Sequence, residues 1–411
     1  MTGSPTSAGS TGPSGLEVAF QAEEGGSTRA YLEVDGRPVS SLWIVPFLLR
    51  VGESVVRMDG MAGVGTDEAF RNRGYSRRVL EATVEHMRQG DAALSMLYGI
   101  PDYYPKFGYA TAGPDHFFCL TSLTEAASLP QGWRARPFVP DDLPAVRRLY
   151  EGNTAREVGA AVRAPEGKSW TKLAAEPAEG APADCRVVEN GQGEIVAYAW
   201  RAAWPWYTQV VQRQAPDALV IVEAMAEGPD AADAVLAACR AWAVEESRSR
   251  PQPVKDVLFA LPPSGPVAAA AMQQSSRFIR KYDACAGSMA RVLHVKRLLE
   301  ALKPELSARL QASGSCFQGA LLFRTELGDA CLNLSPEGLT VVASGPTPAP
   351  GGAPALEVYL PQMALARLAL GAFPPGDLLA RLERPPVDEA ARLLEALFPL
   401  RHPHMHLPDR F

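Results

Sequence analysis

Apolar and polar residues alternate along much of the first third of the chain, which predicts strands, and one stretch has the spacing of a helix. Leu80, Val84 and Met87 recur at helical intervals, and Gly90 ends the helix that they predict. Strands are expected at residues 16–20, 28–34, 39–49, 54–66, 92–98 and 116–120. The helix is expected to pack its apolar face on the sheet that these strands form.

A similar pattern begins again at Trp133 and a third region begins near Ala290. In the middle region, a strand precedes a helix that Asp142 caps. Further strands are expected there at residues 185–188, 194–200 and 219–224, with a long helix at 231–246. In the last region, helices are expected at residues 293–310, 361–370 and 387–398, strands at 319–326, 330–335, 339–344 and 355–359, and a Pro/Gly loop at 345–354. The pattern predicts a protein of the α/β (α+β) class.

Size, charge and cysteine content narrow the choice of function. The chain has 411 residues, of which 47% are hydrophobic, enough for two or three domains with separate cores. A formal net charge of −6 argues against a nucleic-acid partner and suits a cationic substrate. The six cysteines show no CxxC spacing, which fits a reducing compartment. With neither a signal pattern nor an apolar run of about 20 residues, we expect a cytoplasmic protein with no membrane partner.

A basic, glycine-containing turn joins the strand at residues 54–66 to the helix that follows. Its sequence is Arg71-Asn72-Arg73-Gly74-Tyr75-Ser76. A helix N-terminus offers unpaired N–H groups and the positive end of the helix dipole, and two arginines add positive charge. The turn therefore predicts a site for a pyrophosphate, although an arginine pair on the surface beside a turn glycine would have the same sequence.

Two motifs in order give the chain a family resemblance. Arg71-x-x-Gly74-x-Ser76 resembles the Arg/Gln-x-x-Gly-x-Gly/Ala signature of GNAT acetyltransferases, with a small serine at the last position. The later segment Tyr104-x-x-Phe107-Gly108-Tyr109 resembles a motif of the Eis (enhanced intracellular survival) acetyltransferases. The resemblance implies acetyl-CoA as co-substrate. Its pyrophosphate would be held by backbone N–H groups of the turn, and its pantetheine amides would pair with the preceding strand end; the residues are Val64, Gly65, Thr66, Arg71, Asn72, Arg73, Gly74, Tyr75 and Ser76.

The same resemblance implies two catalytic residues. Tyr104 matches the tyrosine that protonates the departing thiolate; its alternative is a core aromatic residue, the role we expect for Tyr103 and Tyr109. Phe411 matches the terminal aromatic residue whose α-carboxylate acts as a base in the Eis family. Residues 399–411 keep several apolar side chains that a frayed tail would not need, so Phe411 is alternatively a hydrophobic clasp between domains.

Other reactive side chains carry weaker signals. His402, His404 and His406 alternate along an extended segment and would share one face. No acidic or cysteine partners stand at supporting spacing, so we expect solvated or hydrogen-bonded histidines and no metal. Cys119 is expected to be an inert strand cysteine, because direct transfer from a thioester needs no protein nucleophile.

The domain organisation follows from the patterns and the resemblance together. Residues 1–15, almost all Gly, Ser, Thr and Pro, are expected to be a disordered tail, and residues 16–130 a GNAT domain. Residues 131–289 are expected to form a second GNAT-like domain without a coenzyme A motif, because Glu227, Asp230 and Asp233 crowd the equivalent turn. Residues 290–411 resemble a sterol-carrier-type domain. The first domain lacks the opening strand and two helices that usually wall the acceptor cleft, so either the cleft is open or another domain supplies the wall.

Taken together, the resemblance implies an N-acetyltransferase that transfers an acetyl group directly to a primary amine. The acceptor would be an aminoglycoside, a polyamine or a lysine-like amine, and the protein would be a homo-oligomer. Two alternatives remain at this point: a lipid or sterol carrier with degenerate GNAT modules, and a purely structural or partner-binding protein.

Overall fold

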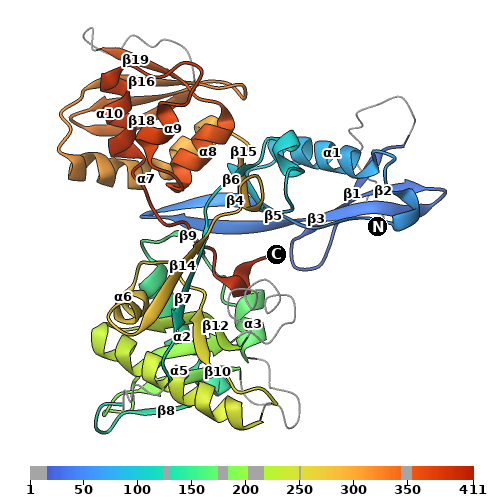
Figure 1. Cartoon of the computed structure of the whole chain (residues 1–411). Helices are drawn as coiled ribbons and strands as arrows, with labels where there is room; N and C mark the ends of the chain where they lie inside the picture. The colour runs from blue at the N-terminus through green and yellow to red at the C-terminus, as the bar shows by residue number, and fades with distance from the viewer. Residues whose placement is uncertain (1–15, 124–128, 175–183, 202–216, 250, 344–353) are drawn as a thin grey trace.

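The computed structural model describes residues 16–123, 129–174, 184–201, 217–249, 251–343 and 354–411. The strands form three sheets, each accompanied by helices, and Figure 1 shows the first sheet lying between the other two units. The expected tail at residues 1–15 and most of the loop expected at 345–354 lie outside the described residues. No helix in the described ranges is long and apolar enough to cross a membrane.

The first sheet carries the two longest strands. Its order is β1-β2-β3-β4-β5-β15-β6, and β9 also pairs with β3. The strands are β1 (Val18–Ala22), β2 (Thr28–Val34), β3 (Arg37–Val51), β4 (Ser54–Thr66), β5 (Leu94–Gly99), β6 (Ala110–Thr111), β9 (Val158–Ala161) and β15 (Gly287–Val292). Helix α1 (Tyr75–Gln89) buries Val79, Leu80, Val84 and Met87 against one face. The helix face predicted from the sequence is confirmed.

The second sheet has the order β14-β7-β13-β12-β11-β10-β8. Its strands are β7 (Asp115–Leu120), β8 (Arg134–Pro137), β10 (Cys185–Glu189), β11 (Ile195–Arg201), β12 (Ala218–Ala226), β13 (Asp256–Phe259) and β14 (Ser276–Lys281). Helices α2 (Leu143–Thr154), α3 (Lys168–Ala174), α5 (Pro229–Ser249) and α6 (Pro266–Met272) accompany it. As in the first sheet, a strand, a helix and a parallel strand follow in order, here β12, α5 and β13.

The first two sheets exchange strands. β7 was expected to complete the first sheet but pairs with β13 and β14 in the second, and β15 of the later chain pairs with β5 and β6 in the first. The expectation for β7 is wrong, because its apolar pattern fits either sheet and only the packing selects one. The boundaries at residues 130 and 290 therefore do not separate the sheets, and the domain division stays a prediction.

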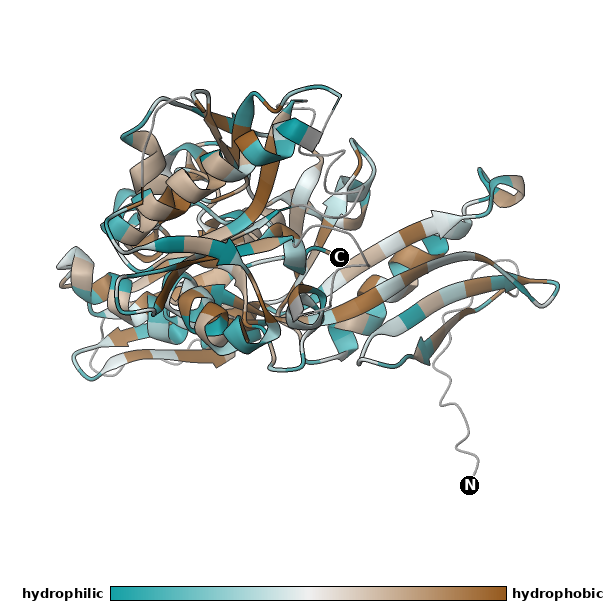
Figure 2. Cartoon of the chain, turned by 90° about the horizontal axis from the view of Figure 1, so that it is seen from below, coloured by the Kyte–Doolittle hydropathy of each residue, from teal (hydrophilic) through white to brown (hydrophobic). Residues whose placement is uncertain are grey.

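The third sheet is small and has the order β18-β17-β16-β19. It consists of β16 (Gly319–Arg324), β17 (Ala330–Ser335), β18 (Gly338–Ala343) and β19 (Ala355–Tyr359), with helices α7 (Val295–Ser313), α8 (Gln362–Leu370), α9 (Pro375–Leu379) and α10 (Asp388–Leu397). Figure 2 shows hydrophobic segments along the strands and helices, and one apolar core joins this unit to Leu49, Met58 and Leu94 of the first sheet. The chain end returns to the first sheet after α10, and both views place the C-terminus beside its long strands.

Candidate active site

Strands β4 and β5 pair only over a short stretch, in the middle of β4 and at the start of β5. They pair in parallel from Met58, opposite Leu94, to Gly60, opposite Met96. Beyond Gly60, β4 stays paired with β3 as far as Thr66, but its other edge has no strand partner in the described chain. Val64, Gly65 and Thr66 lie on this stretch, and an unpaired strand edge can hydrogen-bond to the amides of an extended ligand.

The predicted anion-binding turn lies at the start of α1. Gly74 is the residue before the helix and has φ +78°. The first hydrogen bond there runs from the Arg78 N–H to the Gly74 carbonyl at 3.1 Å, so the amides of the first helical turn have no acceptor within the helix. Arg71 and Arg73 are exposed beside them. The sequence and the fold thus bring unpaired N–H groups and two guanidinium groups to one turn.

An aromatic turn lies next to this helix start. Tyr104 begins the short 3-10 helix η2 (Tyr104–Phe107) and is buried. The Tyr103 and Ser76 hydroxyl oxygens are 2.7 Å apart and share a hydrogen bond, which ties the aromatic turn to α1. Tyr109 is fully buried and its hydroxyl is 2.6 Å from the Ser95 hydroxyl. Tyr109 is therefore a packing residue as expected, whereas Tyr103 also has a hydrogen bond to the α1 turn that the sequence did not indicate.

Tyr104 and Phe411 approach the gap between β4 and β5 from opposite faces of the sheet. A methyl group on Gly99 would lie 2.7 Å from a ring carbon of Tyr104, and one on Gly60 would lie 2.6 Å from the ring of Phe411. Side chains alternate along a strand, and the register places Gly60 with Met96. Gly60 and Gly99 therefore face opposite sides. Gly60 is the last residue of β4 that pairs with β5, and Gly99 lies three residues beyond its partner Met96.

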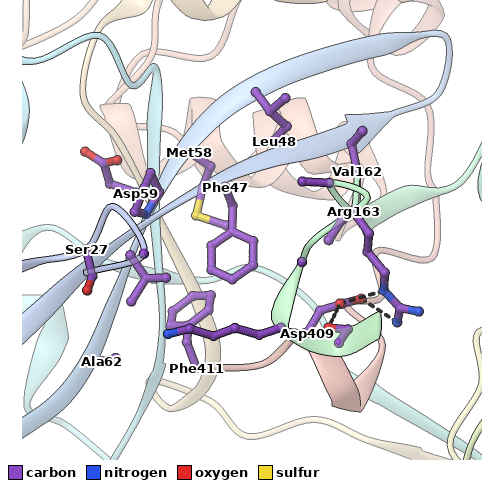
Figure 3. A pocket seen from close by; sticks show the side chains of 18 of the residues that line it. Ser27, Phe47, Leu48, Met58, Asp59, Ala62, Val162, Arg163, Asp409 and Phe411 are labelled. Carbon is purple, nitrogen blue, oxygen red and sulfur yellow. Dashed lines mark hydrogen bonds and ion pairs between the residues drawn. The ribbon is translucent and has the colours of Figure 1, made fainter. Parts of the chain in front are cut away.

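Phe411 lies in an aromatic setting at the end of the chain. Its ring centroid is 5.1 Å from that of Phe47 on β3 and 5.9 Å from that of Tyr98 on β5. Figure 3 shows Phe411 and Phe47 together at the pocket, with Asp409 bound to Arg163 close by. The terminus thus reaches the first sheet. Both roles considered for Phe411, a catalytic α-carboxylate and a hydrophobic clasp between domains, require this position.

The gap opens into a cavity of about 810 Å³. On one side lie β3, β4 and the turn after β1; on the other lie residues of the middle region, from Ala161 to Lys172, and the last four residues of the chain. The middle region and the C-terminal segment thus form one wall of this cavity.

The cavity carries charges of both signs. Burial raises the pKa of the Asp59 carboxyl on β4 to about 6, so this group is partly protonated near neutral pH. Lys168 and Lys172 stand one turn apart on α3, and burial together with Lys168 lowers the pKa of Lys172. Sequence reasoning missed Asp59, whose only signal is a carboxylate among the small and apolar residues of β4 from Met58 to Gly65.

Two of the three histidines near the chain end are buried. The described ranges contain no group of three metal-ligating side chains. His406 is buried and its Nε2 is 3.3 Å from Glu157 Oε2, and His404 is buried beside it. Of the two expected forms, the hydrogen-bonded one is therefore confirmed for His406, and neither ring is solvated, because the segment runs through the interior. Cys119 is buried on β7, and burial raises the pKa of its thiol.

Comparisons with known proteins agree with this geometry. Residues 21–112 match the family described as acetyltransferase (GNAT) domain. The chain is an acyltransferase of the GNAT fold. The GNAT family match covers β4, α1, β5 and the aromatic turn, which together make the gap described above. No sequence among the curated proteins matches the chain.

Solved structures share the GNAT fold over nearly the whole length. A GCN5-related N-acetyltransferase from Kribbella flavida has a TM-score of 0.67 at 19% identity, covering 93% of this chain and 87% of its own. A probable N-acyltransferase from Enterococcus faecalis V583 has a TM-score of 0.67 at 14% identity, with 94% and 89% covered. Eis1 from Mycobacterium abscessus has a TM-score of 0.61 at 15% identity, with 95% and 92% covered. At these identities the likeness shows the fold alone.

Proposed function

We propose that the protein is an acetyl-CoA-dependent N-acetyltransferase that acetylates a primary amine by direct transfer. The observation that carries this proposal is the gap between β4 and β5, which has an anion-binding turn at one end and Tyr104 and Phe411 on its two faces. The cavity beside it is large enough for a small-molecule acceptor. The lipid-carrier alternative is not favoured by the comparisons, which match the GNAT domain.

The residues present fit the coenzyme. A methyl group at Gly74 would meet no atom within 4 Å, so a phosphate has room to approach the backbone there. In this proposal Arg71, Asn72, Arg73, Gly74, Tyr75 and Ser76 hold the pyrophosphate, and Val64, Gly65 and Thr66 hold the pantetheine amides. The bound coenzyme supplies the activated acetyl thioester.

The protein supplies the two proton transfers. Phe411 takes a proton from the acceptor ammonium through its α-carboxylate, directly or through a water molecule, which frees the amine to attack the thioester carbonyl. As the C–S bond breaks, Tyr104 gives its phenolic proton to the thiolate, and the tyrosinate regains a proton when the new amide nitrogen loses its remaining extra proton. Burial and then Tyr103 raise the pKa of Tyr104, so the phenol holds its proton at neutral pH until that step.

Finer assignments belong to the same proposal. The chain is proposed to be Eis-like, cytoplasmic and homo-oligomeric, and its acceptor to be an aminoglycoside, a polyamine or a lysine-like amine. The third sheet with α7, α8 and α10 is proposed to be a sterol-carrier-type domain. No nucleic-acid or membrane partner is proposed, in keeping with the net charge of −6.

A thiol-release assay tests the function. The protein is incubated with acetyl-CoA and a panel of amines, and free thiol is measured with and without each amine. Because Lys168 and Lys172 line the cavity with Asp59, the panel pairs hexylamine with 6-aminohexanoate and 1,6-diaminohexane. Amine-dependent thiol release supports the proposal; if acetyl-CoA binds but no amine on a broad panel is acetylated, the proposal is wrong.

A further inference from the structure

Asp409, next but one to the chain end, is a buried and fully bonded carboxylate. The Arg163 guanidinium donates from Nε to Asp409 Oδ1 at 2.7 Å and from Nη2 to Oδ2 at 2.9 Å. Ser169 also donates to Oδ1 at 2.7 Å, and the Tyr150 hydroxyl shares its proton between the Ala161 carbonyl at 2.8 Å and Asp409 Oδ2 at 3.2 Å. A bidentate pair with two further donors fixes both the position and the orientation of a carboxylate. Asp409 is therefore anchored, not merely enclosed.

Arg163 is itself held on its other side. Glu223 on β12, which is fully buried, accepts from Arg163 Nη1 at 3.1 Å and from Nη2. Tyr198 donates to Glu223 at 2.7 Å. The guanidinium also lies over the rings of Tyr150 and Trp170, 3.8 and 4.6 Å from their centroids. Every group of this cluster except Asp409 belongs to the middle region, so the cluster is a preformed socket for the chain end.

The socket lies at the strand of the second sheet that corresponds to β4 of the first sheet. In the first sheet, β4 is followed by α1 and then by the parallel strand β5, and the gap beside β4 is the proposed transfer site. In the second, β12 is followed by α5 and the parallel strand β13, and Glu223 lies on β12. The 3-10 helix η4 (Leu407–Asp409) contacts β12. The end of the chain thus docks on the strand that corresponds to the transfer strand of the first sheet.

The short distance from the socket to the terminus limits where Phe411 can lie. Two residues span at most about 7 Å, so anchoring Asp409 confines the terminal ring and carboxylate to a small volume. The intervening Arg410 is held as well, with its Nη2 2.6 Å from Asp115 Oδ1 and its guanidinium 4.6 Å from the centroid of the Tyr98 ring. Phe411 then reaches Gly60, where β4 and β5 separate.

We propose that the second GNAT-like unit has become a receptor for the chain's own end, and that Arg163, Glu223 and Asp409 are positioning residues that place Phe411 at the transfer site. The inference rests on the proposed function only for its effect on turnover. The docking itself is a property of the folded chain and has its own readout. Loss of the socket should free Phe411 without disturbing the acetyl-CoA site on the other face of the sheet.

The experiment compares Asp409→Asn with a matched control. Glu305→Gln also removes a buried carboxylate paired with a guanidinium, Glu305 to Arg309 at 2.6 Å, but on α7. For each protein we would measure kcat, the KM for acetyl-CoA, the unfolding midpoint and the rate at which carboxypeptidase A releases Phe411. Asp409→Asn should lower kcat at least tenfold, leave the KM for acetyl-CoA within twofold, and speed phenylalanine release at least tenfold. Glu305→Gln should lower the midpoint without changing the other three.

Two milder variants keep the test decisive if Asp409→Asn does not fold. Ser169→Ala and Tyr150→Phe each remove one donor to Asp409 and should give the same changes at a smaller size. If the folded variants keep wild-type kcat and wild-type resistance to carboxypeptidase, the proposal is overturned. If the wild-type protein acetylates no amine, the proposed function fails, and the phenylalanine release rates still decide whether the socket holds the terminus.

Discussion

Gly74 has two properties that require glycine: a positive φ and a backbone that a ligand can approach. Its φ of +78° lies in the left-handed region that side-chain-bearing residues avoid, and its missing side chain leaves the backbone open to a ligand. Gly228 shares both properties, with φ +90° and no atom within 4 Å of an added methyl group, but it precedes α5 among carboxylates. The two glycines differ in the charge around them, which makes Gly228 a matched control.

Gly74→Glu should abolish the rise in unfolding temperature that acetyl-CoA causes, because a carboxylate would stand against the pyrophosphate. Gly228→Glu should introduce the same backbone strain of roughly 1–2 kcal/mol. It should keep the full rise in unfolding temperature that acetyl-CoA causes. The measurement is thermal unfolding of both variants with and without acetyl-CoA. An unchanged shift in Gly74→Glu would show that the coenzyme site has been misassigned.

Tyr104→Phe removes only a hydroxyl. We expect turnover to fall by about 10²-fold or more, the usual scale for one general acid, with acetyl-CoA affinity unchanged. Tyr109→Phe is the control, because its hydroxyl is bonded to Ser95 in the core and its loss should cost about 1 kcal/mol of stability and little turnover. Steady-state kinetics and calorimetry separate the cases. If Tyr104→Phe turns over like the wild type, Tyr104 is a core aromatic residue.

At the scale of elements, the C-terminal segment is the part whose role can be tested by length alone. The Phe411 ring lies against Gly60 and Phe411 lines the cavity, so residues added after it would enter the cavity and move the terminal carboxylate away from β4. Adding a few residues after Phe411, or deleting it, should abolish transfer while acetyl-CoA still binds. The same residues added before Met1 serve as the control. Normal amine acetylation by the C-terminally extended protein would reduce Phe411 to a clasp between domains.

Local sequence patterns predicted the elements far better than their partners. The bounds expected for β2, β4, β17 and β19 are those observed, because alternation and turn residues are local signals. The exchange of β7 and β15 was not predicted, since an apolar strand carries no mark of the sheet that it joins. The pattern for the first strand also placed it at residues 16–20 instead of at Val18–Ala22.

The candidate site divides in the same way. The residues of the turn at Arg71–Ser76 are contiguous, so the sequence alone predicted that its glycine and arginines lie together. The socket joins Arg163, Glu223 and Asp409, which are separated by 60 and 246 residues along the chain from Arg163. No spacing rule connects such residues, and the middle region therefore looked only like a unit that had lost its coenzyme motif.

At the scale of the whole molecule, histidines lie where the C-terminal segment passes between the sheets. His116 on β7 is buried and its ring stacks with that of Phe278 on β14, with the two ring centroids 5.9 Å apart. The ring centroids of His116 and His402 are 5.6 Å apart. Burial, then His402 and Arg280, lower its pKa to about 4, against the opposing effect of Asp115. Burial, His406 and Arg410 also lower the pKa of His404. The folded protein keeps both rings neutral.

These shifts predict an acid-sensitive fold. A histidine with a lowered pKa takes up its proton first in the unfolded state. Its contribution to stability is therefore complete above pH 6.5 and is lost as the pH falls from 6.5 towards about 4. His406 has the opposite sign: burial lowers its pKa, but its hydrogen bond to Glu157 and the charges of Glu157 and Glu223 raise it overall. Its contribution is complete below pH 6.5 and is lost as the pH rises through the folded value, so it does not offset the loss in acid.

The thermal unfolding midpoint of the wild-type protein should accordingly decrease as the pH is lowered from 6.5 to 4.5. The midpoint of the His116→Phe variant should decrease less over the same pH range. Phenylalanine keeps the stacking on Phe278 but cannot be protonated, whereas carboxylates elsewhere titrate equally in both proteins. Thermal unfolding at pH 7.5, 6.5, 5.5 and 4.5 measures the two slopes, and carboxypeptidase release of Phe411 at the same pH values reports whether the segment leaves first. Equal slopes for both proteins would mean that burial of His116 does not link the fold to pH, and that the acid sensitivity arises from the carboxylates.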